Sequence, residues 1–392
     1  MKIAILGAGI GGLAAASLLQ QFGDITVFDQ FSKPTPVGSG LIIQPVGQRV
    51  LDELGVLETC LTYGQPLYQM LGRRVNDQRA VLDVCYGEVG GNNFGLSIHR
   101  AGLFDALFNK AQKAGVDFKL GHKFKELSEQ KNGVEIKFEQ YAFEECFDLV
   151  IDAMGARSPL SPISTRALDY GALWATVDWL GDIEEDILHQ RYQKAHRMIG
   201  LMPLGRMPSS PQRKTALFWS LPKAQFDDFK NVPISHWHEA ALALWPEAER
   251  YIKQISSWDQ FTCARYCHGT LRRPYWGRII HIGDAAHQAS PQLGQGANMA
   301  LLDALALARA FTEDATNIAQ QYWRTRRRHI LIYQTLSALF TPLYQSNSNS
   351  LPWIRDNILA STSQWPIIRG SLQELVKGSL VRPISNSSTL GI

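Results

Sequence analysis

The sequence has little cysteine and no long apolar run, and its charges nearly balance. Its five cysteines are scattered and odd in number, which argues against a disulfide framework and suits a reducing, cytoplasmic location. No stretch of about 18 apolar residues occurs, so no membrane-spanning helix is expected. The net charge of +3 gives no reason to expect nucleic acid as a partner. The basic run 324–329 is interpreted as a solvated helix face. No second ligand pair accompanies Cys263, Cys267 and His268, so no metal site is predicted.

A glycine-rich segment follows the first apolar strand. It reads Gly7-Ala8-Gly9-Ile10-Gly11-Gly12 and joins a strand at 2–6 to an Ala- and Leu-rich helix at 12–21. Gly7 permits a tight turn, Gly9 lets the backbone approach a pyrophosphate, and Gly12 lets the helix pack closely on the strand. The free N–H groups at the helix start favour phosphate charge. Asp29 ends the next strand, 24–29, where it can bind an adenosine ribose. The segment therefore predicts a dinucleotide site.

A second glycine-rich segment separates FAD from NAD. It begins Gly283-Asp284-Ala285-Ala286-His287 and ends Gly294-Gln295-Gly296-Ala297-Asn298 at the start of a helix. Asp284 is placed to bond hydroxyls of a ribityl chain, and Gly294 and Gly296 let backbone amides reach a flat ring. The positive end of the helix that starts near Ala297 would stabilise the negative charge of reduced flavin. NAD has neither a ribityl chain nor a flavin ring, so the two segments together predict non-covalently bound FAD.

Strand-like runs lie between the two segments. Four of them, at 170–179, 198–204, 215–221 and 261–268, contain many aromatic residues and are typical of a separate sheet. We predict an α/β protein with a discontinuous Rossmann-like FAD-binding domain and an inserted substrate-binding β-sheet domain, followed by C-terminal helices. The predicted boundaries are 1–75, 95–165 and 270–320 for the first domain, 76–94 and 166–269 for the second, and 321–392 for the helices. A loop is expected at 34–40, and Asn132-Gly133 indicates a hairpin turn.

Several side chains are candidates for smaller roles. Trp174, Met202 and Trp219 lie on predicted strands of the inserted sheet and are candidates to line an aromatic substrate pocket; filling the core beneath the sheet is an equally good interpretation. His287 is expected to pack locally or bond the backbone, and His281 to be a satisfied core histidine. One apolar stripe is expected to dock on the protein's own core and not on a membrane; it comprises Ile330, Tyr333, Leu336 and Phe340.

The chain resembles the para-hydroxybenzoate hydroxylase family of single-component FAD-dependent monooxygenases. The resemblance spans nearly the whole chain and rests on both glycine-rich segments and on Gly38-Ser39-Gly40-Leu41-Ile42, Ser97-Ile98-His99-Arg100 and Trp353-Ile354-Arg355-Asp356. It implies that Arg100 contacts FAD, that the stretch with Gly40 passes beside the isoalloxazine, and that Pro291 lies beside flavin C4a. It also implies that O2 and a flavin C4a-hydroperoxide hydroxylate or epoxidise a hydrophobic, aromatic or polycyclic small molecule.

One departure from the family pattern concerns the supply of electrons. The family usually carries Ala-Asp-Gly after its central strand, an acid linked to both FAD and pyridine-nucleotide binding, whereas this chain reads Asp152-Ala153-Met154-Gly155. Gly155 keeps the turn and its contact with the cofactor, but Asp152 is not expected to replace the acid, because it would lie about 7 Å away on a continuing strand. NAD(P)H is the expected donor, its reduction of the flavin is expected to be slow, and a separate flavin reductase is a candidate partner.

Two rival interpretations stay open. A halogenase or an isoprenoid reductase of the same superfamily would bind FAD similarly, although the chain lacks the Trp-x-Trp-x-Ile-Pro segment of halogenases. A flavin-binding protein without oxygenase turnover would fit the lost acid at position 154. The intact segment from Pro291 to Asn298 argues against this second rival.

Overall fold

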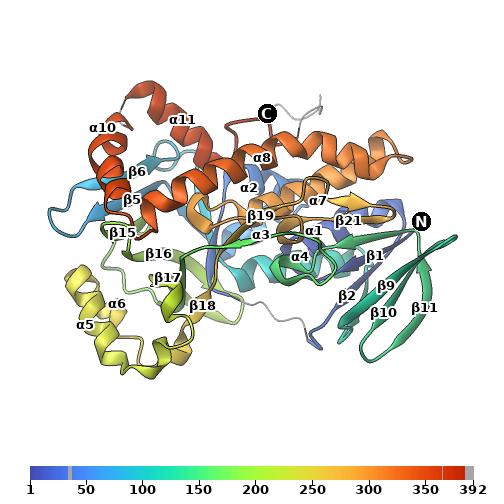
Figure 1. Cartoon of the computed structure of the whole chain (residues 1–392), viewed down its shortest axis with the longest axis horizontal. Coiled ribbons are helices and arrows are strands. Elements are labelled where there is room, and N and C mark those ends of the chain that lie inside the picture. The colour runs from blue at the N-terminus through green and yellow to red at the C-terminus, as the bar shows by residue number, and fades with distance from the viewer. Residues whose placement is uncertain (34–37, 364, 385–392) are drawn as a thin grey trace.

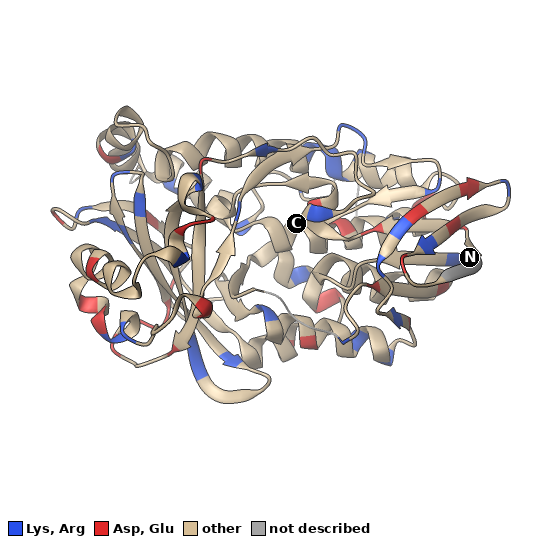
Figure 2. Ribbon diagram, turned by 60° about the horizontal axis from the view of Figure 1, so that its bottom comes forward, with Lys and Arg blue, Asp and Glu red and all other residues tan. Residues whose placement is uncertain are grey.

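The computed structural model describes residues 1–33, 38–363 and 365–384, and it joins two sheet-centred halves along one long helix (Figure 1). Residues 34–37 of the predicted loop and 385–392 of the predicted C-terminal region lie outside the described residues. Basic and acidic residues are interspersed on both halves (Figure 2).

A six-stranded sheet forms the centre of one half. Its order is β20 (Tyr275–Trp276), β21 (Ile279–His281), β12 (Leu149–Asp152), β1 (Lys2–Leu6), β2 (Asp24–Asp29) and β8 (Asp117–Leu120). All of these strands are parallel except β20, which pairs antiparallel with β21 at the edge. The strands predicted at 2–6 and 24–29 are confirmed residue for residue. Strand β1 is apolar almost throughout because both faces of a parallel sheet are covered.

Helices cover one face of this sheet and a smaller sheet covers the other. The helices are α1 (Ile10–Leu19), α4 (Arg100–Lys113) and α7 (Gly296–Glu313); the small sheet consists of β9 (Phe124–Gln130), β10 (Gly133–Phe138) and β11 (Ala142–Phe147). Successive side chains of a strand point to opposite faces, so Ile3 packs with the helices and Ala4 with β10. The predicted hairpin forms between β9 and β10, with residues 131–132 as its loop.

A seven-stranded mixed sheet forms the other half. Its order is β18 (Thr262–Ala264), β14 (Tyr170–Asp178), β17 (Ser210–Pro222), β16 (Arg197–Met207), β15 (Ile187–Gln193), β5 (Gln69–Arg74) and β6 (Ala80–Cys85). Helices α5 (Ile234–Leu244) and α6 (Glu249–Ile252) pack on one face. The predicted domain boundary at residue 75 separates β5 from β6, yet these strands pair with each other. The inserted sheet therefore begins at β5, and the expected boundary is corrected.

The run predicted as a single strand at 261–268 is two strands in two sheets. Strand β18 ends at Ala264, whereas β19 (Cys267–Thr270) pairs with β13 (Arg166–Ala167) and β22 (His287–Gln288). At the break, the Tyr266 hydroxyl accepts a hydrogen bond from Trp174 Nε1 at 2.9 Å, and Arg265 pairs with Asp227. These contacts turn the chain out of the large sheet.

A third small sheet and the C-terminal helices connect the halves. The sheet contains β3 (Gly40–Ile43), β7 (Gly95–His99) and β4 (Gln65–Leu67). Helices α2 (Pro45–Glu53) and α3 (Leu57–Tyr63) lie between β3 and β4 in the chain and contact this sheet. The C-terminal helices are α8 (Ile318–Tyr344), α9 (Ser350–Ile354), α10 (Ala360–Thr362) and α11 (Pro366–Lys377). Ile330 and Tyr333 of α8 are buried against the protein. No described helix has both the length and the apolar composition needed to cross a bilayer.

Candidate functional site

The glycines of the first segment fall into two groups by what surrounds them. Gly7 has a φ of +104°, and a Cβ there would lie 2.5 Å from the Ala153 carbonyl oxygen. A Cβ on Gly12 would lie 2.0 Å from the Gly7 carbonyl oxygen. At Gly9, in contrast, a Cβ would meet nothing within 4 Å. Gly7 and Gly12 therefore serve the packing of the chain, whereas Gly9 leaves open space beside the helix start.

The N-terminus of α1 lies against α7, close to the start of that helix. A Cβ on Gly11 would lie 3.3 Å from Ala300 Cβ, so the two helices pack closely at this point. The first bonds to their caps run from Leu13 N to Gly9 O and from Met299 N to Gln295 O. The backbone N–H groups before these bonds have no partner within their helices, and the helix dipoles favour negative charge there. They belong to Ile10, Gly11, Gly12, Gly296, Ala297 and Asn298.

The Asp29 carboxylate lies at the end of β2, where the sequence predicts it. Its Oδ2 accepts a hydrogen bond from Ala8 N at 2.7 Å, and its Oδ1 accepts one from Phe31 N at 2.9 Å. The carboxylate therefore orients the glycine-rich turn. Each oxygen keeps a second lone pair for a ligand hydroxyl.

Asp284 and Arg100 lie within electrostatic range of each other. Asp284 is exposed and accepts no hydrogen bond from a described residue, and Arg100 is exposed where α4 begins. Asp284 keeps exposed surface, but the protein around its carboxylate disfavours the charged form and raises its pKa; the nearby His287 and Arg100 oppose that shift. A Cβ on Gly38 would lie 3.0 Å from Arg100 Cδ, so a glycine at position 38 gives the arginine room.

The side chains of Gln295 and Asn298 bind the protein itself. Asn298 Oδ1 accepts from Gln44 N at 2.8 Å, and its Nδ2 donates to the carbonyl oxygens of Ile42 and Gly294. Gln295 Nε2 donates to the Val376 carbonyl oxygen at 3.0 Å, toward α11. Their side chains are therefore occupied by other protein groups, and the prediction that these two residues contact the cofactor now applies only to their main-chain atoms.

The loop before α7 is held in an unusual backbone conformation. Gly294 has a φ of +61°, and Pro291 is exposed at the start of the short helix Pro291–Leu293. A Cβ on Gly296 would meet nothing within 4 Å, as at Gly9. A Cβ on Gly40 would lie 2.3 Å from Leu204 Cδ2, so Gly40 is needed for close packing on β16.

Position 154 carries no acid, and the turn around it is intact. Gly155 has a φ of +76°, and a Cβ there would meet nothing within 4 Å. The Met154 side chain packs against the apolar cluster beneath the β9–β11 sheet, which includes Phe28 and Trp276. The turn thus lies next to the first glycine segment through the contact of Ala153 with Gly7.

A buried acid beneath the second segment was not anticipated. Asp303 of α7 accepts hydrogen bonds from Gly283 N at 2.9 Å, His287 Nε2 at 2.6 Å and Arg326 Nε at 2.8 Å. His287 therefore bonds a carboxylate and not the backbone. Arg326 and His329 are buried, so the expectation that the whole run 324–329 is solvated is corrected. The sequence signal that could have predicted this buried acid is that Asp303 is the only acidic residue in the mainly apolar helix segment Ala300–Ala310.

The three candidate substrate residues lie on two different faces of the large sheet. Trp219 pairs with Leu173 across the β14–β17 ladder and packs against Trp237 of α5 in the core. Trp174 and Met202 lie on the opposite face, toward β3 and α8. The prediction that Trp219 lines a substrate pocket is therefore wrong, because strand register places it on the covered face.

A pocket of about 240 Å³ opens on the Trp174 face. It lies between the loop before β3 and the edge of the large sheet, and its lining comprises Gly38, Ser39, Trp174, Thr176, Gln260 and Thr262. The hydroxyls of Ser39 and Thr176 lie 3.2 Å apart across it. No charged side chain of the described residues belongs to this lining.

The arrangement fits FAD. Two open glycine positions, two neighbouring helix N-termini and an acid at the end of β2 suit a dinucleotide. The exposed Asp284 offers acceptors for hydroxyl groups, and the first amides of α7 offer N–H donors for an electron-rich group. The fold and the site together define a flavoprotein that also has a small pocket on its inserted sheet.

Comparison with known proteins identifies the family. A family model described as an FAD binding domain matches residues 1–329, and the chain belongs to that family. It is 25% identical over 379 residues to 6-hydroxynicotinate 3-monooxygenase of Bordetella bronchiseptica, covering 91% of this chain and 92% of that protein. It is 27% identical over 338 residues to 3-amino-4-hydroxybenzoate 2-monooxygenase of Streptomyces cremeus, covering 78% and 77%.

A solved structure shows the same fold. The structure of Klebsiella pneumoniae HpxO complexed with FAD and uric acid matches with a TM-score of 0.83 at 21% identity, covering 97% of this chain and 98% of that chain. The chain is an FAD-dependent monooxygenase.

Proposed function

We propose that this monooxygenase hydroxylates a planar, uncharged aromatic or heteroaromatic ring that binds between the flavin and the inserted sheet. The pocket between Ser39 and Trp174 carries this proposal. An indole face offers stacking, and the hydroxyl and carboxamide groups of Thr176, Gln260 and Thr262 offer hydrogen bonds to ring substituents. The lack of a charged group in the described lining favours a neutral ring over a carboxylate.

The names of the relatives support a ring of this size. They act on 6-hydroxynicotinate and 3-amino-4-hydroxybenzoate, and the HpxO structure contains uric acid. All three molecules are planar and carry polar substituents. Of these, uric acid shows that a ring without a carboxylate group occupies a protein of this fold.

The chain's own residues would hold the cofactor and stabilise charge. We assign the pyrophosphate to the open space at Gly9 and the N-terminus of α1, the adenosine ribose to Asp29, and the ribityl chain to Asp284. The free N–H groups at the start of α7 would stabilise negative charge on the ring, with Arg100 and Pro291 beside it. Bound FAD, once reduced, supplies the chemistry that activates O2.

We propose that NAD(P)H donates the electrons. Its reduction of the flavin is slow, because Met154 occupies the position of the family's usual acid. Its side chain packs in an apolar cluster and offers no group to a pyridine nucleotide. A separate flavin reductase would bypass this step. Rapid anaerobic bleaching of the bound flavin by NAD(P)H alone would contradict the proposal of slow reduction. The five unpaired cysteines support a reducing, cytoplasmic location.

A substrate screen of the FAD-loaded protein tests the function. Neutral heteroaromatic rings and their carboxylated analogues are compared pairwise by substrate-dependent NAD(P)H and O2 consumption and by product mass. We expect one added oxygen atom in the product and a preference for the neutral member of each pair. Preference for the carboxylated member would contradict the proposed substrate class, and a product that gains hydrogen or halogen would contradict oxygenation.

A pair of tryptophan variants tests the site. Trp174→Ala should lower kcat/KM about tenfold or more, whereas Trp174→Phe keeps an aromatic face and most of the activity. Trp219→Phe is the matched control, because this tryptophan lies on the opposite face of the same sheet. Equal losses in Trp174→Ala and Trp219→Phe would show that the pocket is not the substrate site.

A further inference from the structure

A fully buried carboxylate lies at the end of β12, two residues before the position of the usual acid. Asp152 has no exposed surface. Its Oδ1 accepts a hydrogen bond from Met154 N at 3.0 Å, and its Oδ2 accepts from Ser158 Oγ at 2.6 Å. His281 of the neighbouring strand β21 pairs with it in register, and its Nδ1 lies 2.7 Å from Oδ2. Three donors, two from the following turn and one from strand β21, therefore converge on one side chain.

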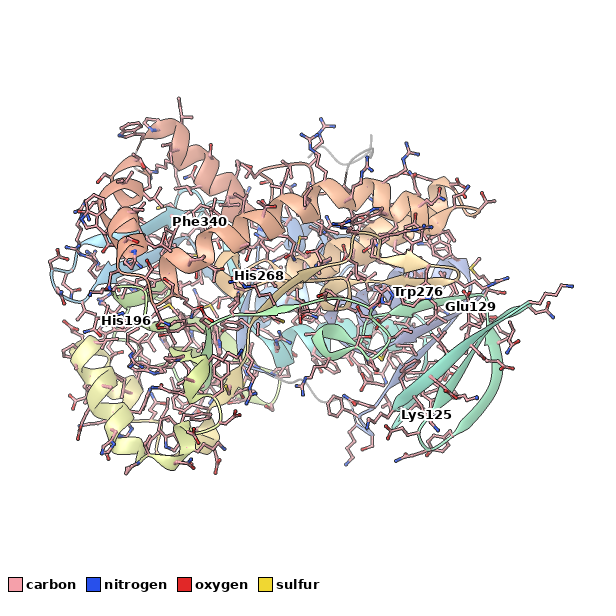
Figure 3. All side chains as sticks on the ribbon, viewed as in Figure 1. Lys125, Glu129, His196, His268, Trp276 and Phe340 are labelled. Carbon is pink, nitrogen blue, oxygen red and sulfur yellow. The ribbon has the colours of Figure 1, made fainter. Side chains whose placement is uncertain are left out.

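The proton positions at this cluster follow from its surroundings. His281 is fully buried, and its Nε2 has no hydrogen-bond partner among the described residues. A proton on Nε2 would therefore be buried without an acceptor, so the neutral ring carries its proton on Nδ1 and donates it to Asp152. The ring also packs against Trp276, with the ring centroids 4.5 Å apart and the ring planes tilted by 39°. Trp276 lies at the sheet edge near β9–β11 (Figure 3). With three donors directed at it, the Asp152 carboxylate is the anion.

The residues that Asp152 holds form the turn that touches the first glycine segment. Met154 and Ser158 flank the short helix Gly155–Arg157. The carbonyl oxygen of Ala153, between Asp152 and Met154, is the atom that a Cβ on Gly7 would meet at 2.5 Å. Ala153 N donates to Leu6 O at 2.8 Å. The turn therefore holds the glycine segment in place from its packed side at Gly7, and Gly9 of the same segment borders the open space.

We propose that Asp152, oriented by His281, is a positioning residue for FAD binding. It does not touch the cofactor. Its anionic carboxylate ties Met154 N and Ser158 Oγ together and so fixes the turn against Gly7. The Asp152 carboxylate thus binds groups of the protein itself. The proposal concerns cofactor affinity and is independent of the substrate.

The exchange of Asp152 for asparagine is the sharpest test, because asparagine keeps the size but loses one acceptor. The amide nitrogen would face His281 Nδ1, and the ring would then have to place its proton on the unpartnered Nε2. We expect the dissociation constant of FAD, measured by flavin fluorescence on the deflavinated full-length chain, to rise about tenfold or more. Asp148→Asn is the matched control at the other end of β12, where Asp148 accepts from Lys2 N at 2.8 Å, and it should bind FAD as the unaltered chain does.

Rescue separates positioning from a general loss of stability. His281→Leu alone leaves Asp152 with its two turn donors, so it should bind FAD more tightly than Asp152→Asn. Adding His281→Leu to Asp152→Asn removes the unpartnered proton and should recover part of the affinity. If Asp152→Asn does not fold, Ser158→Ala removes one donor and should still weaken FAD binding. Unchanged FAD affinity in Asp152→Asn, or in Ser158→Ala when the former does not fold, would overturn the proposal.

Discussion

His287 Nε2 lies 2.6 Å from Asp303 Oδ2, and both side chains are buried beneath the loop that carries Asp284. The other oxygen of Asp303 accepts a hydrogen bond from Arg326 Nε, and Arg326 Nη1 donates to the Pro383 carbonyl oxygen at 2.6 Å. Burial alone would raise the pKa of Asp303, but His287 and Arg326 outweigh it and lower that pKa below its usual range. One carboxylate thus connects the proposed flavin loop with the C-terminal part of the described chain.

Asp303→Asn should destabilise the folded protein by about 3–5 kcal/mol, because it leaves the buried Arg326 cation without its charge partner. The measurement is urea-induced unfolding of the FAD-saturated protein. Glu313→Gln, at the exposed end of the same helix, should change the free energy of unfolding by about 0.5 kcal/mol or less. Similar values for the two variants would contradict a central role for Asp303.

His329 gives the stability a pH dependence. Burial, followed by the charge of Arg326, lowers the pKa of His329 from its ordinary value of 6.5 to about 3. The unfolded chain therefore takes up a proton below pH 6.5 that the folded protein refuses until about pH 3. Stability contributed by the neutral ring is complete above pH 6.5 and is lost as the pH falls through this window.

We expect His329→Gln to flatten this dependence. The contribution of the histidine amounts to about 1.4 kcal/mol of unfolding free energy per pH unit within the window. This contribution is measured by urea unfolding of both FAD-saturated proteins at three pH values. These are pH 7.5, about one unit above the ordinary histidine pKa, and pH 6.0 and 4.5, about half a unit and two units below it. Parallel pH profiles for the two proteins would rule the explanation out.

Gly9→Ala should separate cofactor binding from folding. The φ of Gly9 is −79°, and the added Cβ would meet no protein atom within 4 Å, so the apoprotein should unfold at the same temperature. FAD affinity should fall at least about tenfold if the pyrophosphate occupies that space. Gly370→Ala, also in open space but on α11, should leave FAD affinity unchanged and stabilise its helix by up to about 1 kcal/mol. Wild-type FAD affinity in Gly9→Ala would place the cofactor elsewhere.

Asn298→Ala should loosen the loop before α7. It removes the partners of Gln44 N and of the Ile42 and Gly294 carbonyl oxygens, each of which costs about 1–3 kcal/mol when buried and unpaired. We expect a lower midpoint of urea unfolding and weaker FAD binding together. Loss of FAD affinity without loss of stability would instead mean that the Asn298 side chain contacts the cofactor directly.

The sequence sufficed where function depends on local backbone geometry. The strands at 2–6 and 24–29 and the first glycine turn follow from short-range patterns, because apolar runs and glycines determine them over few residues. The inserted sheet was also recognisable as a separate unit. Its edge was not, since β5 joins it by pairing with β15, more than a hundred residues away in the chain.

Long-range register and side-chain pairing escaped prediction for the same reason. Trp219 is buried on the covered face because it aligns with Leu173, and an alternating pattern cannot say which face of a sheet meets a ligand. His281 is paired on one nitrogen only, through Asp152 on a strand distant in sequence. In the sequence, Arg326 cannot be distinguished from the neighbouring surface arginines, because its burial results from the packing of α8 on α7. Of these residues, only Asp303 could have been suspected from the sequence, because it is an isolated acid among apolar helix residues.

The split of the cofactor half between the two ends of the chain has a consequence during synthesis. A nascent chain that has emerged only as far as residue 278 contains β1, α1 and β2, but it lacks β21 beside β12 and α7 beside α1. The part of α1 that packs on α7 is then uncovered, although α4 is already present, and only one of the two helix starts exists. We therefore expect FAD binding to wait until α7 has been synthesised, and until then the uncovered apolar surface is open to non-specific association.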